Sequence, residues 1–99
     1  MADPIVSESP QDNEQILRVS SSSSASKLAV AISHAVYDSK QVTLRAVGAG
    51  AVNQAVKGIA IASGYVGMRG LTLYTRPGFT TIPMKDGDVS AIVLRVESR

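Results

Sequence analysis

The sequence has no cysteine and no tryptophan, and its 99 residues include one histidine, one phenylalanine and three tyrosines. The absence of cysteine excludes disulfide bonds and thiolate metal sites, and it gives no indication of an oxidising compartment. Because hydrophobic residues make up 44% and aromatic residues only 4%, the core must be built mainly from alanine, valine, isoleucine and leucine. A chain of this length forms one domain with a modest core, which oligomerisation would help to stabilise.

Residue combinations that support catalysis or metal binding are also missing. The single histidine, His34, lies in a predicted helix with no nucleophile near it in the sequence. There is no Gly-x-Ser-x-Gly motif and no cluster of metal ligands, and a turn explains Asp86 and Asp88. We therefore expect a protein that is not an enzyme, with no catalytic residues, no metal and no cofactor.

Basic residues are absent from the first 15 positions, which hold four acidic residues and carry a charge of −4. Residues 16–99 contain all ten lysines and arginines and carry +6. We predict that residues 1–14 are a disordered acidic tail and that residues 15–99 form the folded domain. The tail is either a solubilising leader or a shield for the basic body, which can attract polyanions. Because the start of the chain lacks a basic segment and an apolar run, we expect a soluble, cytoplasmic protein.

The hydrophobic pattern predicts alternating strands and helices. Strands are expected over residues 15–20, 41–47, 70–76 and 89–97, and helices from the serine run at 20–24 to about 39 and over about 51–66. Pro77-Gly78 should kink the third strand, which resumes over 79–84, and Asp86-Gly87 signals a hairpin. The order β-α-β-α-β-β predicts the α/β class, as a two-layer α+β sandwich with two helices on one face of a four-stranded mixed sheet.

The second predicted helix carries two apolar stripes. The stripe assigned to the core consists of Val52, Ala55, Val56, Ile59 and Ser63. A second strip, off this core stripe, contains Gln54, Gly58, Ile61 and Tyr65. We predict a dimer interface at Gly58, Ile61 and Tyr65, because exposed apolar strips often mark interfaces and glycine permits close approach. The alternative is a wider core-facing stripe.

Alternation along the strands predicts a basic sheet face. If Leu17 and Val19 face the helices, one arginine of every strand points the opposite way. These outward residues are Arg18, Arg45, Arg76 and Arg95, with Tyr74 among them. Arginine suits phosphate, and an aromatic ring can stack on a base, so this face is a candidate nucleic-acid site. The alternative is an ordinary solvated sheet face with Glu97 as a counter-charge.

A glycine turn joins the second predicted strand to the second predicted helix. Gly48 and Gly50 open this helix, whose free N–H groups and positive dipole end suit an anion. The motif is not a dinucleotide fingerprint, because Asn53 stands where the third glycine would fall. Two interpretations remain: a loop that contacts phosphate, or a tight turn that needs small residues.

The same segment resembles the stage V sporulation protein S family. The similarity covers roughly residues 16–99 and is carried by Gly48-Ala49-Gly50-Ala51-Val52-Asn53-Gln54-Ala55-Val56-Lys57, Ile59-Ala60-Ile61-Ala62, Gly64-Tyr65-Val66 and Pro77-Gly78-Phe79-Thr80. That family is similar in turn to the Alba group of small chromatin and RNA-binding proteins. The resemblance implies an Alba-like fold, a homodimer or higher homo-oligomer, and binding of DNA or RNA by a bacterial regulatory protein.

The chain departs from the Alba pattern at the basic positions of the site. Alba proteins commonly place basic residues in the glycine loop and a lysine pair before the first helix, whereas this chain has small residues and serines there. Lys27 and Lys57 remain nearby, so backbone groups and the amides of Asn53 and Gln54 would have to replace the missing charges.

These observations favour a non-enzymatic, dimeric nucleic-acid-binding protein that contacts the phosphate backbone and has a sporulation-related or developmental role. One alternative is a structural or assembly protein that acts through self-association without nucleic acid. Another is a small-ligand sensor that uses the turn at residues 48–51.

Overall fold

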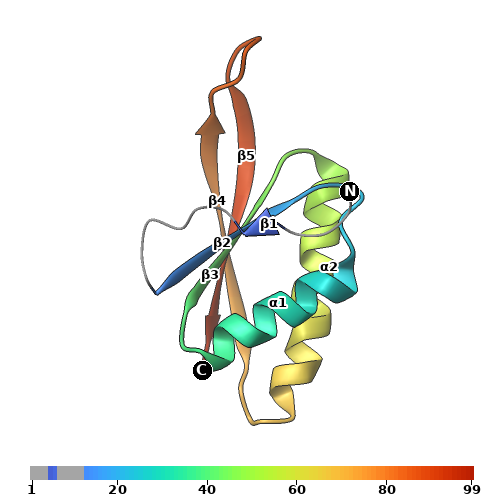
Figure 1. Cartoon of the computed structure of the whole chain (residues 1–99), viewed down its shortest axis with the longest axis vertical. Helices are drawn as coiled ribbons and strands as arrows, with labels where there is room; N and C mark the ends of the chain where they lie inside the picture. Colours follow the sequence, from blue (N-terminus) through green and yellow to red (C-terminus); the bar gives the residue numbers. More distant parts are fainter. Residues whose placement is uncertain (1–4, 7–12) are drawn as a thin grey trace.

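The computed structural model describes residues 5–6 and 13–99 (Figure 1). The predicted order of elements is confirmed, and a two-residue strand precedes it. The elements are β1 (Ile5–Val6), β2 (Glu14–Val19), α1 (Ala25–Tyr37), β3 (Gln41–Ala46), α2 (Ala49–Gly67), β4 (Leu73–Ile82) and β5 (Val89–Ser98). None of the helices in these residues is both long and apolar enough to cross a membrane.

The strands form one mixed sheet in the order β1-β2-β3-β5-β4. β2 and β3 are parallel, whereas β5 runs antiparallel to both β3 and β4. The short β1 therefore adds a fifth strand to the four predicted ones. It pairs with the free edge of β2. The predicted two-layer α+β architecture is confirmed, because the inward residues of β2, β3 and β5 share one core with both helices.

The core lies between the sheet and the helices. The inward side chains Leu17, Leu44, Leu28 and Ile32 are completely buried. Ser24 caps α1, as expected for the serine run, because its hydroxyl accepts a bond from the backbone N–H of Lys27 at 3.2 Å. The predicted alternation along β3 is confirmed on the helix-facing side, where Val42, Leu44 and Ala46 are each at most 1% exposed.

The predicted kink at Pro77-Gly78 is wrong, because β4 runs without interruption through both residues. Proline is tolerated here since β4 is an edge strand, where a missing N–H donor breaks no ladder on the outer side. The hairpin signalled by Asp86-Gly87 is present, with residues 83–88 connecting β4 to β5. Gly87 takes a positive φ of 118°, which glycine adopts without strain.

The predicted core stripe of α2 is confirmed at Ala55 but wrong at Val56. The helix buries Ala51, Ala55, Gly58, Ala62 and Val66. Val56 of the predicted stripe is 51% exposed, and Val52 and Ile59 are only partly buried against the core. The inward residue at position 58 must be small, because a Cβ atom at Gly58 would lie 2.8 Å from the Cβ atom of Leu28 in α1.

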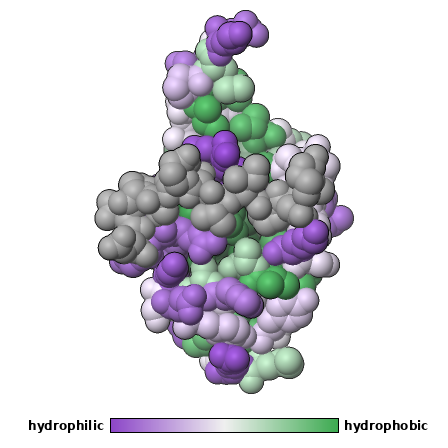
Figure 2. Space-filling view, viewed as in Figure 1, coloured by the Kyte–Doolittle hydropathy of each residue, from purple (hydrophilic) through white to green (hydrophobic). Residues whose placement is uncertain are grey.

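The β4–β5 hairpin projects beyond the helices along the long axis of the molecule (Figure 1). Apolar side chains are exposed along this projection beneath a hydrophilic tip (Figure 2). Phe79 is 81% exposed and Met84 58% exposed. The hairpin therefore presents apolar surface that the two helices do not cover.

The predicted acidic tail lies mostly outside the described residues. Within it, Ile5–Val6 forms β1, with Ile5 opposite Arg18 and Val6 opposite Leu17. Glu14 already belongs to β2, so the described domain begins slightly earlier than predicted. The disorder of residues 1–14 stays a prediction.

Candidate nucleic-acid interface

The strand register brings the predicted arginines onto one face of the sheet. Arg18 lies opposite Arg45 across β2 and β3, and Arg76 lies opposite Arg95 across β4 and β5. The two pairs share a face because Thr43, two residues from Arg45, lies opposite Arg95. This surface, away from the helices, is called the open face here. Its arginines have the predicted positions, while their role in binding stays a prediction.

The arginines of the open face differ in their surroundings. Arg76 donates two hydrogen bonds to one carboxylate oxygen of Glu97, at 2.8 and 3.1 Å. This exposed ion pair adds little stability, but it places an acidic group beside Arg76. Arg18 and Arg95 are exposed, and Arg45 is half-buried.

Gly78 makes room for one of these guanidinium groups. A Cβ atom at Gly78 would lie 3.2 Å from a terminal nitrogen of Arg95 and 3.3 Å from Val93. The Arg95 side chain therefore lies across β4 at the point where that strand has no side chain. Pro77-Gly78, which suggests a kink from sequence, in fact allows an arginine to lie flat on the open face.

Tyr74 lies on the open face as predicted, but its ring is already in contact with a cation. The guanidinium carbon of Arg99 lies 4.6 Å from the centre of the Tyr74 ring. The sequence reasoning missed Arg99, although alternation from Arg95 through Glu97 leads to it. Stacking of a base on Tyr74 would require Arg99 to move or to sandwich the base.

Two hollows lie side by side on the open face. The first, of about 210 Å³, is lined by Glu14, Ile16, Thr43, Arg45, Phe79, Thr80, Val93 and Arg95. The second, of about 240 Å³, is lined by Arg18, Val19, Arg45, Val47, Ile82 and Met84. Arg45 belongs to both. Neither hollow was foreseen, because β4 and β5 reach the other strands only in the tertiary structure.

The remaining predicted residues gather at the N-termini of the helices. Both helices start at the carboxyl edge of the parallel β2–β3 pair, so the serine loop lies against the start of α2. A Cβ atom at Gly50 would lie 2.8 Å from the Cβ atom of Ser21. The side-chain amide of Gln54 donates to the backbone carbonyl of Ser23 at 2.8 Å.

These contacts bear on the two interpretations of the turn at Gly48 and Gly50, a loop that contacts phosphate or a tight turn that needs small residues. Gly48 takes a positive φ of 91°, and Gly50 is needed for packing against the serine loop. Both facts support a tight turn that needs small residues. The Gln54 amide already joins the two helix starts, which leaves Asn53 and Lys57 as the exposed polar side chains of α2 in this region. Lys27 is exposed on the first turn of α1.

The predicted dimer strip faces α1 of the same chain for much of its length. Gly58 is buried, and a Cβ atom there would lie 2.8 Å from the Cβ atom of Leu28. The hydroxyl of Tyr37 in α1 donates to the Tyr65 carbonyl at 3.5 Å. Gly58 is therefore corrected from a dimer residue to a contact between α1 and α2. Ile61 is partly buried against the core, and Tyr65 remains 42% exposed.

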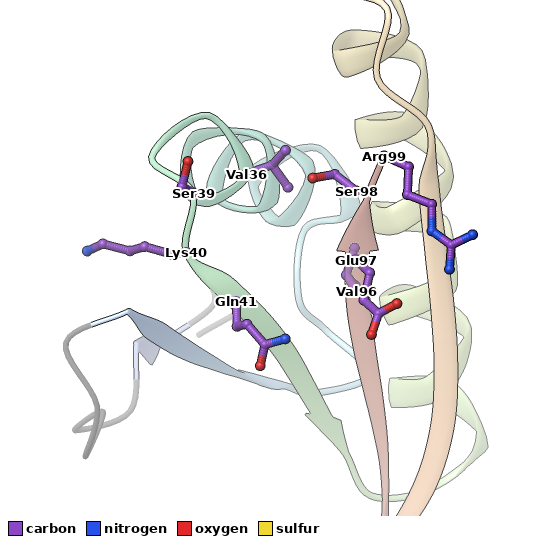
Figure 3. A pocket seen from close by; sticks show the side chains of 8 residues that line it. All are labelled: Val36, Ser39, Lys40, Gln41, Val96, Glu97, Ser98 and Arg99. Carbon is purple, nitrogen blue, oxygen red and sulfur yellow. The ribbon is translucent and has the colours of Figure 1, made fainter.

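A further hollow lies where β5 ends, beside the turn between α1 and β3. Its volume is about 380 Å³, and its lining includes Lys40, Gln41, Glu97 and Arg99. The Lys40 side chain points away from it (Figure 3). In residues 13–99, no three acidic, histidine or cysteine side chains come together as metal ligands. None of the described residues that line this hollow is a predicted binding residue, so we assign no ligand to it.

The described residues define a small two-layer α+β protein with a basic, open sheet face. Residues 15–99 match the model of the family "Stage V sporulation protein S (SpoVS)". This match covers nearly the whole chain, so the chain belongs to the SpoVS family, as its resemblance indicates. The name of the family connects it to sporulation.

Proposed function

We propose that this SpoVS-family chain is a non-enzymatic, nucleic-acid-binding regulatory protein that acts as a dimer. The observation that carries the proposal is the register that places Arg18, Arg45, Arg76 and Arg95 on one sheet face without a covering helix. Guanidinium groups bind phosphate oxygens well, and several on one surface attract a polyanion. The family's connection to sporulation supports a developmental role.

The open face suits the phosphate backbone better than the helix N-termini do. At the helix starts, Gln54 and Gly50 make internal contacts, and Lys27 and Lys57 are the only basic residues that the prediction placed there. The open face holds the four predicted arginines together with Arg99, and of its acidic residues Glu14 and Glu97, Glu97 pairs with Arg76. We therefore place the main contact on the open face and a secondary one at Lys57 and Asn53.

The dimer contact is placed on the outer flank of α2. Val52, Val56 and Ile59 follow each other at helical spacing and lie off the side that contacts α1. The half-exposed Val56 and its partly buried neighbours form apolar surface that a second copy would cover. The Alba resemblance implies a dimer, and this flank replaces Gly58 as its centre.

The test is binding of DNA and RNA across a salt series. Backbone contacts predict that log K falls linearly with log salt concentration, with a slope of about −0.9 per neutralised phosphate for duplexes and −0.7 for single strands. Absence of salt-sensitive binding to both nucleic acids overturns the proposal. In that event, higher oligomers formed without nucleic acid would favour the alternative function of a structural or assembly protein. The exposed apolar residues Val56, Phe79 and Met84 are the observation that supports this alternative.

A further inference from the structure

The two hollows of the open face combine apolar walls with arginine. In the first hollow, Ile16 and Val93 provide apolar surface, Arg45 and Arg95 provide cations, and Glu14 is an acidic member of the lining. In the second, Val47, Ile82 and Met84 lie beside Arg18 and Arg45. Val93 is only 5% exposed, which places it deep in its hollow although no helix covers this face.

We propose that the open face binds single-stranded nucleic acid, with one base in each hollow and Arg45 between them. This inference rests on the proposed function and specifies its ligand. Bases have apolar ring faces and polar edges, and in a single strand each is attached to an adjacent phosphate. The hollows offer matching groups, since Thr43 and Thr80 can bond base edges and the arginines can pair with phosphates or stack on rings.

The size of the hollows argues against a larger free ligand. Volumes of about 210 and 240 Å³ lie below the range of about 300–1,000 Å³ typical of sites for drug-sized molecules. Two small hollows that share one arginine fit two neighbouring units of a chain better than one compact molecule.

The shape of the face argues against a duplex as the preferred ligand. In a duplex the ring faces are stacked on one another, and proteins read base edges by inserting a helix or a β-ribbon into a groove. A hollow is concave, so it cannot be inserted into a groove as a helix or a β-ribbon can. A bound duplex would therefore leave the two hollows unfilled. A single strand can turn its bases out of the stack and seat them in the hollows.

An abasic strand separates base binding from backbone binding. The full chain is titrated with a single-stranded oligonucleotide, with an abasic strand of equal phosphate number, and with a duplex of the same sequence, as DNA and as RNA. We expect the intact strand to bind at least about 25-fold more tightly than the abasic strand at equal salt, since each of the two seated bases contributes about 5-fold or more. The duplex is expected to bind more weakly than the intact strand. Base-dependent binding of either the DNA or the RNA strand supports the proposal.

Met84→Ala tests the second hollow, and Met68→Ala is the matched control. Met84 is 58% exposed and Met68 is 84% exposed, so neither change should disturb the core. Met84→Ala should weaken binding of the intact strand about 5-fold or more and leave binding of the abasic strand unchanged. Met68→Ala, next to the end of α2, should alter neither.

Three outcomes are distinguishable from one another. Equal binding of the intact and abasic strands, with a normal salt slope, overturns the base hollows and leaves the proposed function in place. Failure of every strand and duplex to bind overturns both. Equal effects of Met84→Ala on the intact and abasic strands would also overturn the hollows, because the methionine would then not contact a base.

Discussion

Gly58 and Gly64 lie on the same helix but have different surroundings. A Cβ atom at Gly58 would collide with Leu28 at 2.8 Å, whereas a Cβ atom at Gly64 would meet nothing within 4 Å. The Cβ atom of Leu28 is fixed to its backbone, so α1 itself would have to move. Glycine at 58 thus sets the distance between the helices, and glycine at 64 does not.

We predict opposite effects for Gly58→Ala and Gly64→Ala. At Gly58, overpacking costs about 1–3 kcal/mol and exceeds the gain of about 1 kcal/mol from replacing glycine within a helix. The free energy of unfolding should therefore fall by up to about 2 kcal/mol for Gly58→Ala and rise by up to about 1 kcal/mol for Gly64→Ala. Urea denaturation at two protein concentrations measures both. If the Gly58→Ala effect disappeared on dilution, the residue would act between chains and not between α1 and α2.

Arg45 and Arg76 are predicted to contribute unequally to nucleic-acid binding. Arg45 lines both hollows, whereas Arg76 is bound to Glu97. Arg45→Gln should flatten the salt slope by about 0.7 for a single strand or 0.9 for a duplex, and Arg76→Gln should flatten it by less. Lys57→Gln, on the solvent side of α2, serves as the comparison. If only Lys57→Gln changes the slope, the helix N-termini form the site and the open face is merely solvated.

At the scale of elements, α2 shows how one helix divides its surface. Its small residues pack against the sheet and α1, and Gln54 and Tyr65 bond to the α1 side. Valine and isoleucine at positions 52, 56 and 59 lie on the other flank, where Val56 is 51% exposed. Val66 is fully buried and Val52 and Ile59 pack partly against the core, so Val56 is the apolar residue of this flank that is most available to a second copy.

We predict that Val56→Asp abolishes the dimer. An acidic group at the centre of an apolar contact would be buried without a partner, which is strongly unfavourable. Light scattering at tens of micromolar should give a dimer for the native chain and a monomer for Val56→Asp. Lys57→Glu is the control, since it places an acid at the next position, which faces solvent. A native monomer, or a Val56→Asp variant that keeps the native mass, would contradict this interface.

At the scale of the whole molecule, charge is divided between the N-terminal segment and the body. Three acidic residues, Asp3, Glu8 and Asp12, precede β2, and β1 pairs with the edge of β2 beside Arg18. Of this segment, the pairing places residues 5–6 beside β2. Shielding of the arginines and an independent solubilising leader both stay predictions.

We predict that Asp3→Asn, Glu8→Gln and Asp12→Asn together tighten binding of nucleic acid at low salt. Charges act over a Debye length of about 10 Å at 0.1 M salt, so the difference should disappear as the salt concentration rises. The substitutions keep β1 and leave the core unchanged, so thermal unfolding should stay the same. Deletion of residues 1–12 serves as a second comparison. Equal affinity of the native and triple-variant chains at low salt would rule out shielding.

Much of this architecture follows from the sequence alone. Side chains alternate with a period of two along a strand, so the direction of one side chain fixes the directions of the others. The placement of Arg18, Arg45, Arg76 and Arg95 on one face was therefore predictable. The order of strands and helices, the serine cap of α1 and the hairpin at Asp86-Gly87 also follow, because they depend on local patterns.

Only the tertiary structure decided how the elements meet. The inward side of α2 was misassigned because the hydrophobic pattern favours valine, whereas the distance between α1 and α2 requires Gly58 and alanines there. The first hollow of the open face is not predictable from alternation along one strand, since it forms from residues on four strands. Gln54 is similarly engaged by Ser23, 31 positions away. Local periodicity fixes the direction of a side chain within its own element, but contacts between distant elements depend on how closely those elements pack.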